Sequence, residues 1–573
     1  MNPSTRQKWL RRKRRIAKRL RARTWRAARA AGPVLAARNI RYEMADRTRA
    51  VACGGIGAVH LLARRVGLVD AVDRGVRRLK AHLPYHESDH VLNVAYNVLC
   101  GGDCLQDLEA LRNDEAYLDA LGASRVPDPT TAGDFCRRFT DESQVLGLME
   151  AINEARLNVW RRQPPDFFAR AAIDADGSIA ETAGECKGGM DISYDGRWGY
   201  HPLVVSLANT REPLYLVNRG GNRPSHERAD EYLDRAVALC RRAGFRSILL
   251  RGDTDFMQTW KLDEWDAAGD VTFVFGADAR KPTVARAEAL PEAAWRRLAR
   301  PPRYEVKTEP RGRRDRVKER VVRDKGFKNL VLKWEDVAEF EHRPDRCRRS
   351  YRVVVLRKRI SVEGGQEKLF EEYAYFFYIT NDRESTAEQV VFTANGRCDQ
   401  ENLIAQLKGG GVGAMANPLD GLLSNWAYMV MASLAWTLKA WWGLMLPASP
   451  GRWHRRQTQE GREVVRMEFK RFVANLIRLP CQVVRGGRRL VYRFLSYNPW
   501  QPALPRRGGL ADAHAVLRES RPLSGYGCPD PPRPSAGEHA RHDKSTQRRR
   551  GQRRRRAHPR QAAEQRRTRL FKA

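Results

Sequence analysis

The sequence lacks the features that mark secreted proteins and structural zinc proteins. Its ten cysteines are scattered along 573 residues, and Cys100 and Cys104 form the single close pair, with no second pair or histidine cluster to complete a zinc site. The first thirty residues lack the apolar segment and the small-residue cleavage site of a secretory signal. We therefore expect buried or incidental thiols and a reducing, cytoplasmic compartment.

Nucleophile constellations and clear membrane spans are also missing. Cys398 has no histidine that can be assigned to it as a partner, and no serine and histidine arrangement is evident. One long apolar run, residues 421–446, is interrupted by Ser424, Asn425 and Lys439. This run predicts a buried helix or helix pair, and no membrane partner is expected.

Positive charge is what the chain has in excess. Its 105 Lys and Arg against 68 Asp and Glu give a net charge of +37 and a pI near 10.3. Thirteen Lys or Arg occur in the first thirty residues, and fourteen occur in the last 33. A field of this sign concentrates polyanions, so we expect a nucleic-acid partner and strongly salt-dependent binding.

The pattern of apolar residues changes along the chain. Periodic apolar positions predict helices from about 50 to 160, including a turn and short helix in VPDPTTAGDFCRRF. From about 168 the sequence predicts three strands, a helix, a strand, a helix and a strand, which is an α/β order. Between 280 and 370, alternation of apolar and basic residues predicts exposed antiparallel strands.

Three carboxylates stand where a mixed sheet could bring them together. Asp176 ends the first predicted strand in IDADGS, and Asp253 ends the fourth in LLRGDTDF. In this order the first and fourth strands can lie side by side, and a packed helix could add Glu401. Asp174 and Asp255 are rival candidates at the two strand ends. A D-x-S/T pattern favours Asp176, and the position directly after LLRG favours Asp253.

Glu401 lies in NGRCDQENLIAQLKGG, between Arg397 and Lys408. At about 100° per residue these three side chains share one face of a helix. One interpretation is a solvated ladder of ion pairs. The other is a site in which the glutamate binds metal and the two cations hold phosphates.

Three crowded carboxylates destabilise a fold unless a cation joins them. Carboxylate oxygens suit Mg²⁺, and two such ions about 3.5 to 4 Å apart activate a water or 3'-hydroxyl and stabilise the leaving oxygen of a phosphodiester. We therefore expect two Mg²⁺ ions, replaceable by Mn²⁺, at Asp176, Asp253 and Glu401.

The ordered set IDADGS, LLRGDTDF and R-x(3)-E-N-x-I-x-x-L-K resembles the DDE transposases of bacterial insertion sequences. It is similar to the broad class with a tyrosine-arginine-glutamate-lysine signature, and most resembles the branch numbered 1380. The likeness covers roughly residues 50–450 and includes GNRPSHERADEYLDRA and NPLDGLLSNWAYMVMASLAW.

The resemblance implies an α/β fold with a ribonuclease H-like catalytic core, interrupted by a β-rich insertion and preceded by a helical DNA-binding region. With the composition of the chain it predicts seven segments. They are a basic arm (1–45), the helical DNA-binding region (46–165), the first part of the core (166–280), the insertion (281–370), the core completion with the glutamate helix (371–450), a basic C-terminal region (451–502) and a disordered Arg- and Pro-rich tail (503–573).

The resemblance also implies an activity. Such a protein cleaves DNA at the terminal inverted repeats of its element and joins the freed ends to target DNA, acting as a homodimer near the bacterial nucleoid. Asp176, Asp253 and Glu401 match the DDE triad, and Arg397 and Lys408 match the phosphate-binding cations.

The chain departs from the pattern at two places. Ala394 replaces the signature's tyrosine, and the arginine-rich tails are not part of the pattern. A noncatalytic nucleic-acid-binding protein derived from a decayed transposase, and a stand-alone metal-dependent nuclease, stay open as alternatives.

Three further side chains are open to two interpretations. Trp198 and Trp334 could stack on an extruded base, although core packing is the simpler expectation. His226 could lie beside the site, or could cap or pack a helix start.

Overall fold

The computed structural model describes residues 7, 10–19, 21, 49–82, 84–300, 321, 330–363, 366–447, 454–486, 489–495 and 498–500. The chain divides into a unit of residues 1–515 and a unit of residues 516–573, and the second unit lies outside the described residues. The predicted tail (503–573), most of the predicted basic arm, and residues 301–320 of the predicted insertion also lie outside them.

Helices fill the region from residue 56 to residue 160, as the apolar periodicity predicts. They are α2 (Ile56–Arg65), α3 (Leu68–Gly75), α4 (Glu87–Cys100), α5 (Leu108–Arg112), α6 (Glu115–Leu121), α7 (Pro129–Arg137) and α8 (Glu142–Trp160). Local sequence explains their starts: Asp128 accepts a hydrogen bond from the backbone N of Thr131 with Pro129 at the first helical position, and Asp141 caps α8 in the same way.

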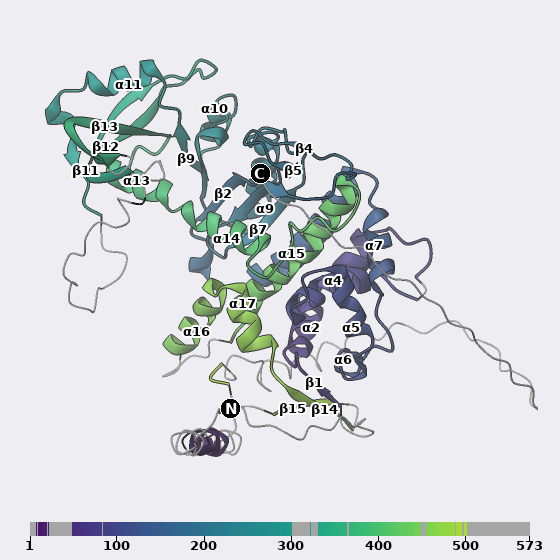
Figure 1. Ribbon diagram of the computed structural model, residues 1–573. Helices are drawn as coiled ribbons and strands as arrows, with labels where there is room; N and C mark the ends of the chain where they lie inside the picture. Colours follow the sequence, from purple (N-terminus) through teal and green to yellow (C-terminus); the bar gives the residue numbers. More distant parts are fainter. Residues whose placement is uncertain are drawn as a thin grey trace, which may run out of the picture. The chain divides into compact units, whose positions relative to one another are not determined.

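The largest sheet within the described residues is a nine-stranded mixed sheet, whose strands β2, β7, β9, β11, β12 and β13 are labelled in Figure 1. Its order is β10 (Arg296–Arg297), β11 (Leu330–His342), β12 (Tyr351–Glu363), β13 (Gln366–Thr380), β9 (Val271–Ala277), β8 (Ile248–Gly252), β2 (Ala171–Gly177), β6 (Leu203–Leu207) and β7 (Glu212–Val217). The neighbours β2, β8 and β9 run parallel, and the other pairs are antiparallel. The predicted α/β class is confirmed.

Alternate residues of the strands build two separate cores on the two faces of the sheet. Leu250 and Phe275 belong to the larger core with the helices α9 (Ala229–Ala243) and α10 (Leu262–Ala267). Leu249 and Val274, each one residue away, pack instead with α13 (Ala387–Asn395). The helix that follows α13 is α14 (Cys398–Lys408), whose Gln400 donates to the backbone O of Asp174 in β2.

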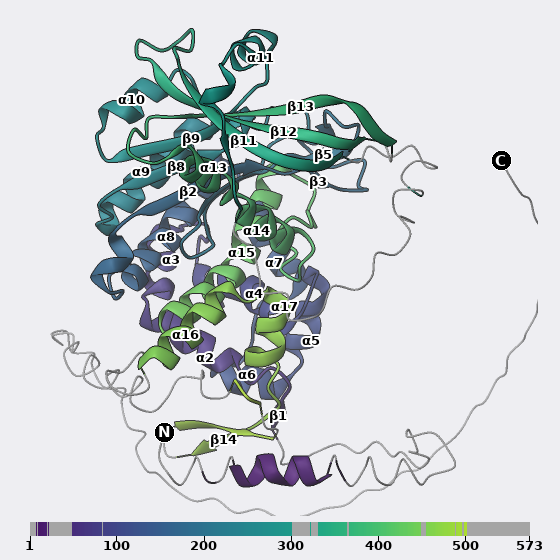
Figure 2. The ribbon, with the colours of Figure 1, turned by 90° about the vertical axis from the view of Figure 1, so that its left-hand side faces the viewer.

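The basic strands after residue 280 extend this sheet (Figure 2). β13 pairs with β9, with Phe377 opposite Ala277 and Thr380 opposite Val274. β11 and β12 then follow as antiparallel neighbours, and α11 (Lys281–Glu288) precedes them. One continuous backbone hydrogen-bond network therefore joins β10–β13 to the strands that carry the carboxylates.

The long apolar run forms α15 (Leu422–Leu444), a helix that is buried almost throughout and packs on β7, α4 and α8 (Figure 1). A helix that is apolar on all sides belongs in a core. Lys439 is fully buried and donates to the backbone O of Val465 at 2.8 Å. No helix among the described residues combines the length and the apolar character that crossing a bilayer requires.

Smaller elements complete the described part. The three-stranded sheet β3 (Ala180–Glu181), β5 (Trp198–Tyr200), β4 (Asp191–Ile192) lies in sequence between β2 and β6. Helices α16 (His454–Arg466) and α17 (Phe469–Phe472) follow α15, and β1 (Ala50–Val51), β14 (Cys481–Gly486) and β15 (Arg489–Phe494) form another sheet.

Candidate active site

Asp176 and Asp253 lie at the carboxyl ends of two neighbouring parallel strands. In the register of β2 and β8 the last pair is Asp174 and Arg251, and Asp176 and Asp253 each follow two residues later. Asp253 is close enough to Asp176 to act on its pKa. Because both strands run in the same direction, their ends meet at one edge of the sheet. The structure therefore brings these two predicted site residues together, as the predicted strand order required.

Asp174 and Asp176 point to the same face of β2, but their surroundings differ. The side chain of Asp174 is 1% exposed, and both of its oxygens accept hydrogen bonds from Arg251, at 2.7 and 2.9 Å. Asp176 is 16% exposed and lies nearer the open strand end. Both oxygens of Asp174 are therefore bound by Arg251, whereas Asp176 lies at the partly exposed end of the strand.

Of the two candidate aspartates at the end of β8, Asp253 and Asp255, the local structure favours Asp253. Asp253 follows the strand directly and accepts a hydrogen bond from the backbone N of Asp255 at 3.1 Å, so it caps a short turn. Asp255 is exposed within that turn. Asp253 is therefore held in place at the strand end.

Glu401 lies in the first turn of α14, with 61% of its side chain exposed. The helix is fixed to the sheet one residue earlier, because the buried side chain of Gln400 donates to the backbone O of Asp174 at 3.1 Å and of Val204 at 2.9 Å. The predicted helix is confirmed, and it brings Glu401 to the side of β2 that carries Asp176.

Arg397 links two of the three carboxylates, those of Asp176 and Glu401. Its Nη1 donates to Oδ2 of Asp176 at 2.8 Å, and its Nη2 lies 3.9 Å from Oε1 of Glu401. Burial opposes the charge of this guanidinium, but Asp176, Asp253 and Glu401 outweigh burial and raise the pKa of Arg397. The predicted pair of Arg397 and Glu401 is present, and Asp176 is the closer partner.

Lys408 lies at the other end of α14. Its Nζ donates to Oγ of Ser178 at 3.3 Å and to the backbone O of Ile179. Seven residues from Glu401 correspond to about 10 Å along a helix. Arg397 and Lys408 therefore contact the same chain segment, 176–179, from two points on one helix.

The two aspartates at the strand ends have too little positive charge around them to offset their burial. Burial raises the pKa of Asp176 to about 6, with Arg397 opposing the rise and Asp253 adding to it. Burial also raises the pKa of Asp253, against the effect of Arg397. A further cation at this edge would be favoured by both groups.

Within the described residues, potential ligand atoms of Asp103, Cys104 and Asp107 lie close enough together to hold one metal ion, whereas those of Asp176, Asp253 and Glu401 do not all lie this close. Asp107 accepts hydrogen bonds from the backbone N of Asp103 at 2.8 Å and of Cys104 at 3.2 Å, which is ordinary capping of a short turn. At the strand ends, the positive charge beside Asp176 comes from the guanidinium of Arg397.

The remaining sequence candidates lie outside this set of contacts. Trp198 is 37% exposed, so core packing is wrong for it, and Tyr194 beside it is 86% exposed. Trp334 is half-buried between the guanidinium groups of Arg297 and Arg359. The backbone O of His226 accepts a hydrogen bond from the side-chain Nε2 of Gln258 at 3.3 Å.

Sequence reasoning missed two residues, Arg251 and Gln400, that tie the strands to α14. Each is adjacent in sequence to a chosen residue or two positions from it, and that proximity was the available signal. Ala394, at the place of the signature's tyrosine, packs against the smaller core.

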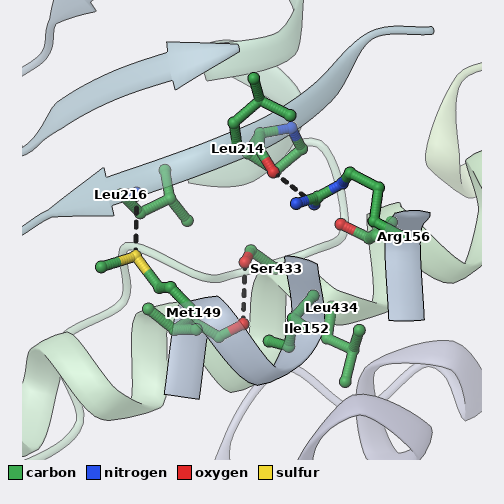
Figure 3. A pocket seen from close by; sticks show the side chains of 10 residues that line it. Met149, Ile152, Arg156, Leu214, Leu216, Ser433 and Leu434 are labelled. Atoms are coloured by element: carbon green, nitrogen blue, oxygen red, sulfur yellow. Dashed lines mark hydrogen bonds between the residues drawn. The ribbon is translucent and has the colours of Figure 1, made fainter. Parts of the chain in front are cut away.

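A small cavity of about 20 Å³, enough for one water, lies apart from the carboxylates (Figure 3). Met149, Arg156 and Leu216 are among its lining residues, and the backbone N of Leu216 donates to the sulfur of Met149 at 3.4 Å. Its size and apolar lining exclude it as a nucleic-acid site.

Comparison with protein families matches residues 33–507 to the model described as Transposase DDE domain group 1. Comparison with curated proteins gives no match. Among solved structures, the cryo-EM structure of a piggyBac transposase synaptic complex with hairpin DNA aligns with 75% of this chain and 80% of its own chain. The identity is 10% and the TM-score is 0.33.

Proposed function

The chain belongs to the group 1 family of transposases with a DDE domain, and on this premise we propose that it cleaves DNA at the terminal inverted repeats of its element and joins the freed ends to target DNA. The observation that supports this proposal is the parallel pairing of β2 with β8, after which Asp176 and Asp253 follow near the helix that carries Glu401. Within the family, the chain resembles the branch numbered 1380 of the class with a tyrosine-arginine-glutamate-lysine signature.

The strands β7, β6, β2, β8 and β9 form the ribonuclease H-like core in this proposal, with β10–β13 as the β-rich insertion. The helices α2–α8 form the DNA-binding region for the repeats. The division into seven segments at the predicted boundaries, from the basic arm to the tail, is part of the same proposal.

Asp176, Asp253 and Glu401 hold two Mg²⁺ ions, or Mn²⁺ in their place. The donor set fits such ions, because it consists of carboxylate oxygens and because burial leaves Asp176 and Asp253 short of positive charge. When bound, the ions supply an activated water or 3'-hydroxyl and charge stabilisation for the leaving oxygen.

The cations of α14 orient the DNA. A guanidinium has five N–H donors, and Arg397 uses one on Asp176 at 2.8 Å, so others can hold a phosphate oxygen next to the carboxylates. Lys408, near Ser178, would hold a second phosphate along the same strand. The partner is DNA, the protein acts as a homodimer on it, and its compartment is the bacterial cytoplasm at the nucleoid.

The test is incubation of the purified protein with a supercoiled plasmid that carries the element's ends, with Mg²⁺ and with EDTA. We expect metal-dependent cleavage followed by joining. Asp176→Asn, Asp253→Asn and Glu401→Gln should each lower the cleavage rate by more than about 100-fold. Mutation of a residue that only hydrogen-bonds to a metal ligand already lowers activity by about 10- to 100-fold.

Asp255→Asn is the matched control, because Asp255 is exposed two residues from Asp253 and should retain cleavage. Cleavage that persists in the three variants contradicts the site. Binding without cleavage by the wild type identifies a noncatalytic DNA-binding protein, and cleavage without joining identifies a nuclease.

A further inference from the structure

A group of buried polar side chains lies directly beneath the strand ends. Arg251, 8% exposed, donates to both oxygens of Asp174, at 2.7 and 2.9 Å. Its third donor group, Nη1, reaches the backbone O of Thr393 in the last turn of α13 at 3.1 Å. One guanidinium thus joins β2, β8 and the helix that precedes the glutamate helix.

The chain between α13 and α14 is shaped around this guanidinium. A Cβ on Gly396 would lie 2.4 Å from Nη1 of Arg251, so no side chain fits there while Arg251 keeps its position. Arg397 follows directly, and Glu401 comes one helical turn later. Arg251 therefore lies against Gly396, the residue at which α13 ends, which comes directly before Arg397, the residue that precedes α14.

Gln400 fixes the same helix from its other side. Its side chain is 2% exposed, and its Nε2 donates to the backbone O of Asp174 and of Val204. Val204 pairs with Asp176 across β2 and β6. The amide therefore holds α14 against the two strands at the level of Asp176.

We propose that Arg251 and Gln400 are positioning residues, which set the start and height of α14 so that the Glu401 carboxylate faces Asp176 and Asp253. This inference rests on the proposed function. Neither residue touches DNA or metal, and both act through Glu401. Carboxylates that bind the same metal ions must be held within about 0.5 Å of the geometry that binds them. The helix α14 needs contacts with the sheet to hold Glu401 to this tolerance.

A second buried pair of an arginine and a carboxylate, Arg156 with Glu212, provides a control. It distinguishes the positioning of catalytic groups from ordinary stabilisation of the fold. Arg156 donates to Oε1 of Glu212 at 3.0 Å and to the backbone O of Pro213 at 2.7 Å, and both charged side chains are at most 1% exposed. Like Arg251, Arg156 binds a buried carboxylate and a backbone carbonyl. It lies on α8, beside the cavity of Figure 3 and away from the carboxylates.

The test compares Arg251→Lys, Gln400→Met and Arg156→Lys in the full-length protein. Titration calorimetry with MnCl₂, without DNA, measures metal affinity, and Asp176→Asn identifies which part of the heat belongs to the site. The cleavage rate at saturating plasmid and the affinity for a DNA fragment with the element's end are measured in parallel. Thermal unfolding reports the stability of each variant.

We expect Arg251→Lys and Gln400→Met to weaken Mn²⁺ binding and to lower the maximal cleavage rate by about 10- to 100-fold. Their DNA affinity should stay within about twofold, and Arg156→Lys should change stability alone. If Arg251→Lys does not fold, the result for Gln400→Met decides whether the positioning role holds. Methionine has nearly the volume of glutamine, so this variant loses only the two hydrogen bonds of Gln400.

Equal effects of Arg251→Lys and Arg156→Lys, or full metal affinity in Gln400→Met, overturn the positioning role while leaving the proposed function intact. A wild-type protein that shows neither Asp176-dependent Mn²⁺ binding nor cleavage overturns the proposed function, and the positioning role with it.

Discussion

Two aspartates on one strand have different physical roles at the scale of single residues. Asp174 exchanges water for a bidentate pair with Arg251, whereas Asp176 is half-buried, with one bond to Arg397 and a second carboxylate nearby. A carboxylate that lacks countercharge costs stability. Asp176 is therefore expected to weaken the fold that carries it.

This cost can be measured as a dependence of stability on pH. Burial raises the pKa of Asp176 to about 6, so between pH 4 and 6 the folded protein binds more protons at this group than the unfolded chain, and its stability falls as pH rises. Without metal, Asp176→Asn should be more stable than the wild type by about 1 to 3 kcal/mol at pH 7.5. Urea unfolding in EDTA at pH 7.5 and 5.0 should show this advantage shrinking at the lower pH.

The exposed neighbour gives the control for this prediction. Asp255→Asn should change the free energy of unfolding by less than about 0.5 kcal/mol at either pH. An advantage of Asp176→Asn that is the same at both pH values would contradict the assigned cause, because a difference in packing does not titrate.

At the scale of elements, the sequence was informative where structure is local. The strand ends at Asp176 and Asp253, the helix of Glu401 and the buried α15 follow from periodicity and short motifs. The bonds of Arg251 to Asp174 and of Gln400 to Asp174 span 77 and 226 residues, so no local pattern indicates them. The pairing of β13 with β9 was missed for the same reason.

The junction between α13 and α14 offers a test at this scale. Gly396 has a helical φ of −59°, so alanine alone would favour the folded state by about 0.5 to 1 kcal/mol. The contact of 2.4 Å with Nη1 of Arg251 reverses that sign. We expect Gly396→Ala to lower the free energy of unfolding by about 1 to 3 kcal/mol, as in other overpacked sites.

A double-mutant cycle isolates the cause of this loss. In an Arg251→Met background, Gly396→Ala should become neutral or stabilising, because the guanidinium is gone. Gly409→Ala, at the other end of α14, is the matched control, because a Cβ added at Gly409 would have no atom within 4 Å. A Gly396→Ala protein that is more stable than the wild type would show that Arg251 moves aside freely.

At the scale of the whole molecule, the charge is unevenly divided between the two units. Residues 516–573 contain 17 Lys or Arg and 5 Asp or Glu, a net of +12 within a total of +37. The family match ends at residue 507, before this unit begins. Catalysis and nonspecific attraction to DNA can therefore be separated by removing one unit.

We expect a chain of residues 1–515 to retain metal-dependent cleavage but to bind DNA with a weaker dependence on salt. Each neutralised phosphate adds about 0.9 to the slope of log affinity against log salt, so the truncated chain should have a slope smaller by at least about 2. A full-length variant whose Lys and Arg in 516–573 are changed to Gln keeps the length and should reproduce the smaller slope. Equal slopes for all three proteins would mean that the +12 of this unit does not meet phosphates, and the charge of residues 1–515 would then account for all of the attraction.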